Sequence, residues 1–312
     1  MTTTLGAGTA LARPAPSRRR KPVAWFKYLA VAPLAVFFLA LIAYPVGQLI
    51  WLALGHVKMR AGAMLWTFAG LDNFTRMLDD ATFRTSILNS LVFITATVVL
   101  TVAFGIVLAL ATDRLVRGQQ LLQNILLWPA IIAPVVISVI WLLILSPQIG
   151  LLNKGLESLG ATGQTWLGDQ TGAMVSIILV DVWHWTPIVF LFVYTALRGL
   201  DSSVLEAAAV DGAGYWQRTR LIVLPLLMPA ILGAAAIRVV MGVKAFDEMY
   251  LLTFGGPGTA TTVISIYLRS VFFESFEYGY GAALSVTVVV LVVLVLVLGF
   301  GFQRALRRLT RG

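Results

Sequence analysis

The chain has 312 residues, of which 59% are hydrophobic and only 12% are charged. A soluble domain carries about a quarter charged residues, so this composition, with apolar runs of about twenty residues, excludes a soluble protein and predicts a helical protein that crosses the membrane several times. A membrane β-barrel is excluded because its strands would alternate apolar and polar residues. The net charge of +9 comes from basic residues at the ends of apolar segments. That pattern indicates membrane orientation rather than a nucleic-acid-binding face, so we expect contact with lipid and none with nucleic acid.

The residue types that usually carry covalent or metal chemistry are scarce. The chain has no cysteine, which excludes disulfides, thiolate metal sites and a cysteine nucleophile. Its only histidines are His56 and His184, and we expect no metal site. The sequence offers no cluster of catalytic groups beyond Asp181 and His184, so no catalytic residue is predicted.

The apolar runs predict six membrane-spanning helices. Residues 1–24, which contain the basic run SRRRK, predict a disordered cytosolic tail. The apolar stretch that follows is too long for the core of a signal peptide. A six-helix transmembrane domain is expected over residues 25–305 and a basic cytosolic tail over 306–312. The spans are expected near residues 28–54, 87–111, 121–145, 173–197, 222–253 and 281–302.

The positions of Lys and Arg predict the orientation of these spans. If the N-terminus is inside, the inner segments hold more than twice as many Lys and Arg residues as the outer loops. Short cytoplasmic loops carry an excess of positive residues. Both termini and the polar stretch 199–221 are therefore expected in the cytoplasm.

Three local patterns in the other segments make predictions of their own. Residues 70–83 have apolar residues at helical spacing, which predicts a short interfacial helix. The GGPG cluster within 253–262 predicts a turn after the fifth span. Lys244 lies at helical spacing from Asp247 and Glu248, which predicts a charged cluster at the outer end of that helix.

The stretch EAAAVDGAGYWQRTRLIVLP, at residues 206–225, is polar and rich in alanine and glycine. Ser203 and Glu206 stand three residues apart and predict a capping box with a helix starting at Ser203. Gly212 can adopt the left-handed conformation that ends a helix, and a helical pattern resumes at Tyr215. The sequence therefore predicts a helix, a sharp turn and a second helix. These residues alone leave two interpretations open, a docking element for a soluble partner and an ordinary interfacial loop.

This stretch resembles the EAA signature of permease subunits of ATP-binding-cassette (ABC) importers. That pattern has Glu-Ala-Ala, then Asp-Gly-Ala, then an apolar residue with Leu-Pro. The matching residues are Glu206, Ala207, Ala208, Asp211, Gly212, Ala213, Leu224 and Pro225. In that family the loop forms a coupling helix in a groove of the ATPase subunit. The resemblance thus implies that the loop 199–221 couples this chain to an ATPase.

The similarity extends over residues 25–305, and residues 246–286 resemble the carbohydrate branch, in particular the first of the two maltose- or glycerol-3-phosphate-type permeases. It implies a type I importer permease fold in the bacterial inner membrane. The implied partners are a second related permease subunit, two ATPase subunits and an external binding protein. The chain has no G-x-x-x-x-G-K-[ST] motif, so ATP and Mg²⁺ are expected on a partner, with no enzyme activity and no cofactor in this chain.

Five polar or aromatic residues fall within predicted spans and are candidates for a buried site. Asp181, Trp183, His184 and Trp185 lie in the fourth span, and Arg238 lies in the fifth. A charge in the hydrocarbon core faces a partner or a wet cavity, and Asp181 and Arg238 are expected at similar depth. One interpretation, which we favour, is a structural ion pair between helices. The other is a wall of a sugar pathway, in which the tryptophans stack on sugar rings.

These observations predict one half of the pore of an importer. We expect it to translocate a sugar or sugar derivative by alternating access, driven by separate ATPase subunits. An ABC permease for a non-sugar solute is the alternative, because it would keep the same loop. A secondary transporter is disfavoured by the cytoplasmic loop, and a membrane enzyme by the lack of a catalytic cluster.

Overall fold

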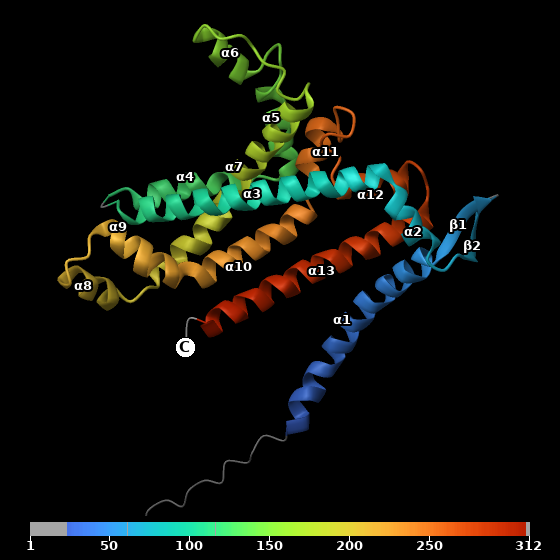
Figure 1. The fold of residues 1–312 in the computed structure, drawn as a ribbon, viewed down its shortest axis with the longest axis horizontal. Helices are drawn as coiled ribbons and strands as arrows, with labels where there is room; N and C mark the ends of the chain where they lie inside the picture. Colours follow the sequence, from blue (N-terminus) through green and yellow to red (C-terminus); the bar gives the residue numbers. More distant parts are fainter. Residues whose placement is uncertain (1–23, 61, 116, 310–312) are drawn as a thin grey trace, which may run out of the picture. The chain divides into compact units, whose positions relative to one another are not determined.

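The computed structural model describes residues 24–60, 62–115 and 117–309. Within them the chain is mostly helical, and its contacts divide it into two compact units, Met1–Gln48 and Leu49–Gly312 (Figure 1). The described part of the first unit is one apolar helix, the larger part of α1 (Ala24–Ala53), whose side chains are almost all exposed. The cytosolic tail expected over 1–24 lies outside the described residues, apart from Ala24, where α1 begins.

Five helical segments among the described residues are long and apolar enough to cross a bilayer, which takes about 20 residues. They are Tyr28–Ala53 within α1, α3 (Ala81–Asp113), α7 (Gln170–Arg198), Tyr215–Val243, and the Tyr278–Val297 part of α13 (Tyr278–Leu309). The predicted helical membrane fold is confirmed. Because α13 runs to Leu309, the first part of the basic tail expected over 306–312 is helical. Residues 310–312 lie outside the described part.

The third predicted span, 121–145, is not a single helix. It is broken into α4 (Gln119–Ile131) and α5 (Pro134–Ile144), which are bent by 96°. Ile132 and Ala133 between them are extended. Proline disfavours the helical conformation in the residue before it, so Pro134 accounts for the extended Ala133. The described residues hold six candidate spans if this bent pair counts as one.

The fifth predicted span, 222–253, begins and ends earlier than expected. The helix starts with α9 (Tyr215–Arg218), passes through the π-helical turn η1 (Thr219–Val223) and continues as α10 (Leu224–Val243). In the π turn the Leu224 N–H bonds the Thr219 carbonyl, and Pro225, which follows, has no N–H to restore the α pattern. The chain leaves the helix after Val243, and a separate helix, α11 (Asp247–Thr253), follows.

The segment between the first two long helices contains a β-hairpin that the sequence interpretation did not foresee. Strands β1 (Gly55–Arg60) and β2 (Ala63–Phe68) pair antiparallel, with Gly55 opposite Phe68. The helix predicted within residues 70–83 is confirmed as α2 (Asp72–Asp79). Its position at a membrane interface stays a prediction. A further short helix, α6 (Leu151–Ser158), follows α5.

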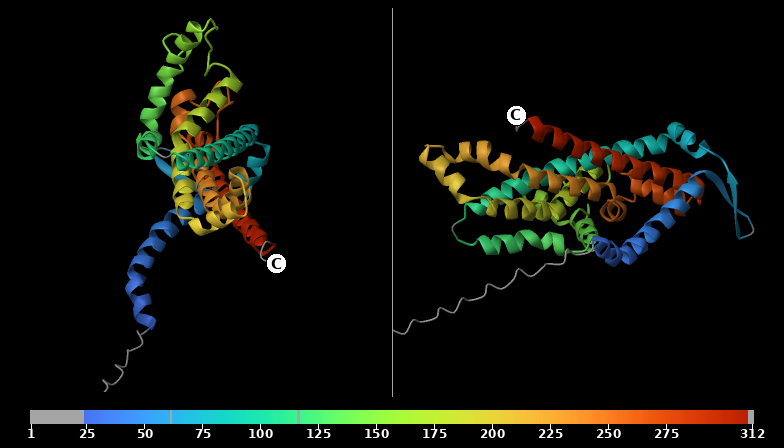
Figure 2. Two further views of the ribbon diagram at one scale, coloured as in Figure 1. Left: turned by 90° about the vertical axis from the view of Figure 1, so that its left-hand side faces the viewer. Right: turned by 90° about the horizontal axis from the view of Figure 1, so that it is seen from below.

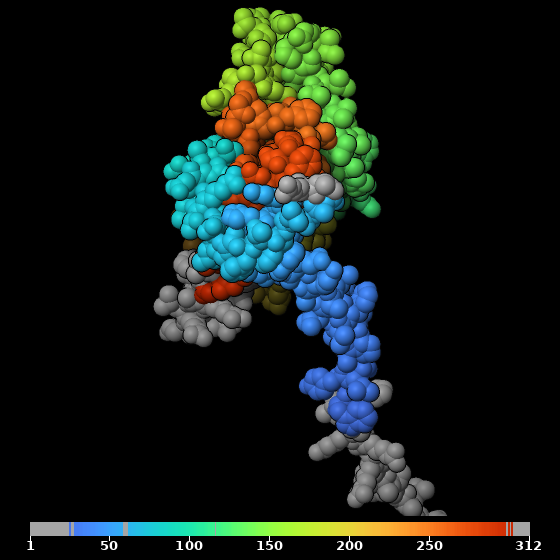
Figure 3. Space-filling view, turned by 90° about the vertical axis from the view of Figure 1, so that its right-hand side faces the viewer, coloured from blue at the N-terminus to red at the C-terminus, as the bar shows by residue number. Residues whose placement is uncertain are grey.

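The turn predicted over 253–262 is confirmed, and polar side chains of α3 hold it. Asn89 Nδ2 donates to the carbonyl oxygens of Thr259 at 2.8 Å and Thr262 at 3.1 Å. The Ser90 hydroxyl accepts the Ile264 N–H, at the start of α12 (Ile264–Phe273), at 2.9 Å. Figure 3 shows this side of the second unit, with the start of α3 (cyan) next to the α11–α12 region (orange).

Asp80 joins the start of α3 to two later helices. Its carboxylate accepts the backbone N–H groups of Thr82 and Phe83 at the N-cap, and the hydroxyls of Tyr267 and Tyr280. Partial burial acts to raise the pKa of this carboxyl, but the hydrogen bonds outweigh it and hold the pKa below its ordinary value. The junction thus gains stability from an ionised Asp80.

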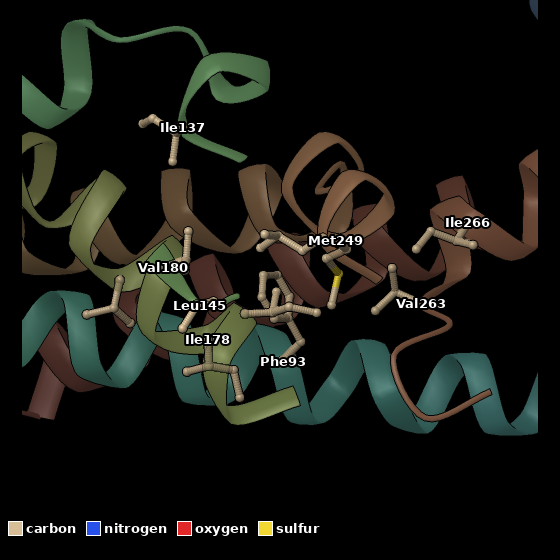
Figure 4. Close-up of a cluster of buried hydrophobic side chains, with 11 residues drawn as sticks. Phe93, Ile137, Leu145, Ile178, Val180, Met249, Val263 and Ile266 are labelled. Atoms are coloured by element: carbon tan, nitrogen blue, oxygen red, sulfur yellow. The ribbon is translucent and has the colours of Figure 1, made fainter. Parts of the chain in front are cut away.

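The second unit has α3 and α7 packed along each other at its centre, with α10 against both and α4 against α7 (Figures 1 and 2). Figure 4 shows a buried apolar cluster between α3, α5, α7 and the α11–α12 region. Its labelled members are Phe93, Ile137, Leu145, Ile178, Val180, Met249, Val263 and Ile266. A second cluster joins α3, α7 and α10 nearer the polar loop and includes Ala109, Phe190 and Leu227.

α3 and α7 approach closely at Gly105. A Cβ added there would lie 2.7 Å from Val189 Cγ1 and 3.1 Å from the Phe190 backbone nitrogen. Such distances are shorter than van der Waals contact, so only glycine fits without a shift of one helix. A small residue at a helix crossing in this way lets two membrane helices approach closely.

Candidate functional site

The polar loop 199–221 folds as a helix, a turn and a second helix, as the sequence predicts. Its first helix is α8 (Ser202–Val210). The predicted capping box between Ser203 and Glu206 is wrong, because the N-cap is Asp201, whose carboxylate accepts the Ser203 N–H at 2.9 Å. That hydrogen bond lowers the pKa of the Asp201 carboxyl. Asp competes well with Ser for this position, since both present an oxygen to the free N–H groups of the first turn.

The turn between the two helices depends on Gly212. Its φ is +79°, in the left-handed region that residues with a Cβ rarely adopt. The Gly212 N–H bonds the Ala209 carbonyl at 3.1 Å, and the Ala213 N–H bonds the Ala208 carbonyl at 2.9 Å. These two bonds satisfy carbonyls at the end of α8, as in a Schellman motif. At the start of α9, the Gly214 N–H donates to Gln217 Oε1 at 2.9 Å.

Most of the signature residues lie on the surface. Glu206, Ala207, Asp211, Gly212 and Pro225 are exposed, Ala213 and Leu224 are half-buried, and Ala208 is buried. Large apolar side chains accompany them, with Val210 89%, Trp216 74% and Leu221 71% exposed. We define these three residues as the apolar loop patch. Exposed large apolar residues mark a surface that binds another protein or contacts the membrane.

Within the bundle, the structure brings Asp181 and Arg238 together as an ion pair between α7 and α10. Both side chains are about 1% exposed. One helical turn further along α7, His184 Nδ1 lies 2.9 Å from Glu248 Oε1 of α11. The four residues form a buried polar cluster that joins α7 to two other helices. A buried charge needs such a partner, because transfer from water into a protein interior is costly.

The two candidate tryptophans differ in their surroundings. Trp185 belongs to the polar cluster, because its ring stacks on His184 at 4.4 Å between centroids and Arg238 Cζ lies 5.8 Å from it. Trp183 is 43% exposed and contacts the edge of Trp141 at 5.6 Å. It lines an apolar groove of about 410 Å³ between α3, α4 and α7. Trp183 is therefore separate from the other four candidates.

Glu248 is the residue that sequence interpretation misplaced. The charged cluster expected from Lys244, Asp247 and Glu248 at the helix end is wrong, since Glu248 is buried while Lys244 and Asp247 are exposed. Glu248 and Leu252 are four residues apart and share one buried face of α11. The four-residue spacing of Glu248 from the apolar Leu252 was a signal that Glu248 lies on the buried face of α11. A buried acid needs a polar partner, and His184 is the histidine that lies within a predicted span.

The polar cluster has one donor to spare. Arg238 Nε is buried and has no hydrogen-bond partner among the described residues. An unpaired buried N–H is uncommon, and a polar molecule such as water or a substrate hydroxyl would satisfy it. The cluster can therefore join helices and still offer a hydrogen bond.

The fold and the loop define a class, an integral membrane protein with an exposed helix–turn–helix loop. The family described as "Binding-protein-dependent transport system inner membrane component" matches residues 101–312, more than half of the chain. The chain belongs to this family. It is a permease component of a binding-protein-dependent ABC transport system and an inner-membrane protein.

Curated relatives share about a third of their residues with this chain. The trehalose/maltose transport system permease protein MalF of Thermococcus litoralis is 33% identical over 252 residues, which is 81% of this chain and 84% of the relative. The sn-glycerol-3-phosphate transport system permease protein UgpA of Yersinia pseudotuberculosis is 31% identical over 256 residues, covering 80% and 84%.

A solved structure supports the fold independently. A bacterial ABC transporter involved in the import of the acidic polysaccharide alginate superposes with a TM-score of 0.79. The match covers 90% of this chain and 96% of that chain at 23% identity. At this identity the match shows that the two chains share a fold, the type I importer permease fold predicted from the sequence.

Proposed function

We propose that this chain forms one half of the pore of an importer for a sugar or a sugar derivative. Membership of the binding-protein-dependent family supports the import role. Relatives named for trehalose and maltose and for sn-glycerol-3-phosphate support the solute class, since each of these is a sugar or a small polyol derivative. The pore would be completed by a second homologous permease subunit, and an external binding protein would deliver the solute.

The exposed helix–turn–helix at 199–221 is the observation that carries the proposed mechanism. It presents Glu206 and Gly212 beside an apolar loop patch that the described residues leave uncovered. A patch of this kind fits a groove on a soluble ATPase subunit. ATP and Mg²⁺ would be bound there, because this sequence has no phosphate-binding loop motif. Two such ATPases would drive alternating access by pushing on this loop and its counterpart in the second permease.

The orientation follows from the same proposal. A loop that meets an ATPase lies in the cytoplasm, which places both termini there as well, in agreement with the excess of Lys and Arg in the inner segments. The hairpin β1–β2 and the turn 253–262 would then face the binding protein outside. In this arrangement the Asp181–Arg238 pair is a structural bridge between α7 and α10, and Trp183 lies away from it.

The test is reconstitution of the complete transporter in proteoliposomes. The permease pair, the ATPase and the binding protein would be co-expressed from their neighbouring genes, and uptake of a radiolabelled panel of disaccharides, polyol phosphates and amino acids measured. We expect ATP-dependent uptake of a sugar or polyol derivative that vanadate blocks. Uptake that an uncoupler abolishes and vanadate leaves intact would contradict ATP coupling. Uptake of an amino acid alone would contradict the solute class.

A further inference from the structure

The turn between α3 and α4 contacts the far side of the polar loop. The guanidinium carbon of Arg114 lies 3.4 Å from the ring centroid of Tyr215 and 5.4 Å from that of Trp216. At 3.4 Å the guanidinium is stacked on the Tyr215 ring, a favoured arrangement for arginine. Tyr215 is the first residue of α9, so the stack joins the end of α3 to the second helix of the loop.

The residue before Arg114 reaches the other flank of the same loop. Asp113, the last residue of α3, has its Oδ1 3.5 Å from Nη1 of Arg198, the last residue of α7. Arg198 precedes α8 and Tyr215 follows it. Two consecutive residues at the end of α3 therefore contact residues on both sides of α8. An exposed ion pair at this distance contributes little, so the stacked Arg114 is the stronger of the two contacts.

These contacts matter because of how the chain is connected. The loop is joined through the backbone to α7 and, through η1, to α10. It has no covalent connection to α3, although α3 packs along α7 and carries the turn-holding residues Asn89 and Ser90 at its other end. Leu200 and Leu205 of the loop pack against the second apolar cluster, which includes Ala109 of α3, and the Asp113–Arg114 end of α3 adds direct side-chain contacts.

We propose that Arg114 is a positioning residue for energy coupling. Its stack on Tyr215 fixes α9 to the end of α3, so that a displacement of the loop moves α3 together with α7 and α10. This inference rests on the proposed role of the loop 199–221 in ATPase coupling. It adds a third helix to those that the ATPase drives, and with it the turn 253–262 that α3 holds at the opposite end.

The test compares Arg114→Met, Arg114→Lys and the control Arg117→Met. Arg117 carries the same charge in the same turn and is exposed. In reconstituted transporters we expect Arg114→Met to leave the protein level and the amount of co-purified ATPase unchanged. The number of solute molecules imported per ATP hydrolysed should fall by about two- to fivefold, which is the shift in a conformational equilibrium expected from loss of one exposed cation–π contact. Arg114→Lys should fall between, because lysine keeps the charge without the planar stack.

A second pair of variants checks that Tyr215 is the partner. Tyr215→Phe keeps the ring and should couple normally, whereas Tyr215→Leu should match Arg114→Met. The double variant Arg114→Met, Tyr215→Leu should be no worse than either single variant. An unchanged ratio of uptake to hydrolysis in Arg114→Met, or an equal loss in Arg117→Met, would overturn the proposal.

Two further outcomes separate this proposal from the function it rests on. Loss of ATPase co-purification in Arg114→Met would overturn it, since Arg114 would then belong to the docking surface. Gly212→Val serves as the reference for the loop itself. If Gly212→Val uncouples transport and Arg114→Met does not, this inference fails and the loop's role stands. If neither variant changes coupling, the role proposed for the loop fails, and with it this inference.

Discussion

The Asp181–Arg238 ion pair allows the sharpest test of the buried polar cluster. The perturbation is a double-mutant cycle with Asp181→Leu, Arg238→Met and the two combined. Leucine approximates the branched shape of aspartate, and methionine keeps much of the arginine stem. Each single variant leaves one charge in the bundle without its partner. The double variant replaces the pair with apolar side chains of similar length.

The magnitude follows from burial. Both side chains are about 1% exposed, so neither charge can turn to water after its partner is removed. Breaking a buried pair by removing one partner costs about 3–5 kcal/mol, whereas replacing the whole pair with apolar residues is close to neutral or stabilising. Since about 1.4 kcal/mol is a factor of ten, each single variant should lower the ratio of folded to unfolded protein by about two to three and a half powers of ten. The double variant should return close to the wild-type ratio.

The assay is unfolding of the detergent-solubilised permease in increasing SDS, followed by tryptophan fluorescence, with the amount of membrane-inserted protein measured in parallel. Arg220→Met is the matched control, because Arg220 is exposed and its loss should change the unfolding free energy by less than about 0.5 kcal/mol. Wild-type stability in both single variants would refute the structural bridge. If those stable variants also fail in transport, the pair belongs to the solute pathway.

Three further predictions concern the loop 199–221, the membrane topology and the junction at Asp80. Gly212→Val and Glu206→Lys should leave insertion intact and weaken ATPase binding or uncouple hydrolysis from uptake, and at Gly212 a Cβ at φ +79° costs about 1 kcal/mol or more. The control Gly214→Ala, at φ −65°, should be tolerated. Normal coupling in both Gly212→Val and Glu206→Lys would contradict the docking role. Because the chain lacks cysteine, a single cysteine introduced as Gln217→Cys should react with a membrane-impermeant maleimide only in inside-out vesicles. Labelling from the outside of cells would contradict the predicted topology. Because the folded-state pKa of Asp80 is depressed, its ionised carboxylate stabilises the fold at pH values above its ordinary pKa of about 3.9, and this stability is lost as pH falls through the lower folded-state pKa. Asp80→Asn should therefore lower the unfolding temperature at pH 7 and make that temperature less dependent on acid pH. Equal unfolding temperatures of the variant and the wild type at pH 7 would contradict this.

The sequence predicts the long helices well and their interruptions poorly. Continuous apolar runs are sufficient to locate α3, α7 and α13, because a lipid-exposed backbone has to be helical. The break before Pro134 has a local signal in the sequence, because proline disfavours the helical conformation in the residue before it. The end of α10 near Lys244 has no proline, and α11, which follows it, packs through Met249 against residues distant in sequence, such as Phe93. Such tertiary preferences are not visible in a local pattern.

The same division applies to the candidate site. The bend at Gly212 is a local property of glycine after an alanine-rich helix, and the sequence alone was enough to predict it. The contact between His184 and Glu248 joins positions 64 apart in sequence, and only the fold brings them together. The pairing of Asp181 with Arg238 could be predicted from the sequence, because charged residues are rare in apolar spans and each therefore has few possible partners. The roles of these residues in transport remain predictions.

The apolar loop patch also has a consequence for how the subunit is made. Val210, Trp216 and Leu221 lie in or next to the polar loop, and each is more than two-thirds exposed. A subunit synthesised in excess of its soluble partner would display this patch to the cytosol, where exposed apolar surface promotes aggregation. Balanced production of the subunits, or rapid proteolysis of the unpaired one, would then matter to the cell as much as the pore itself. The surface that we propose as the ATPase contact would thus mark an unassembled copy for removal.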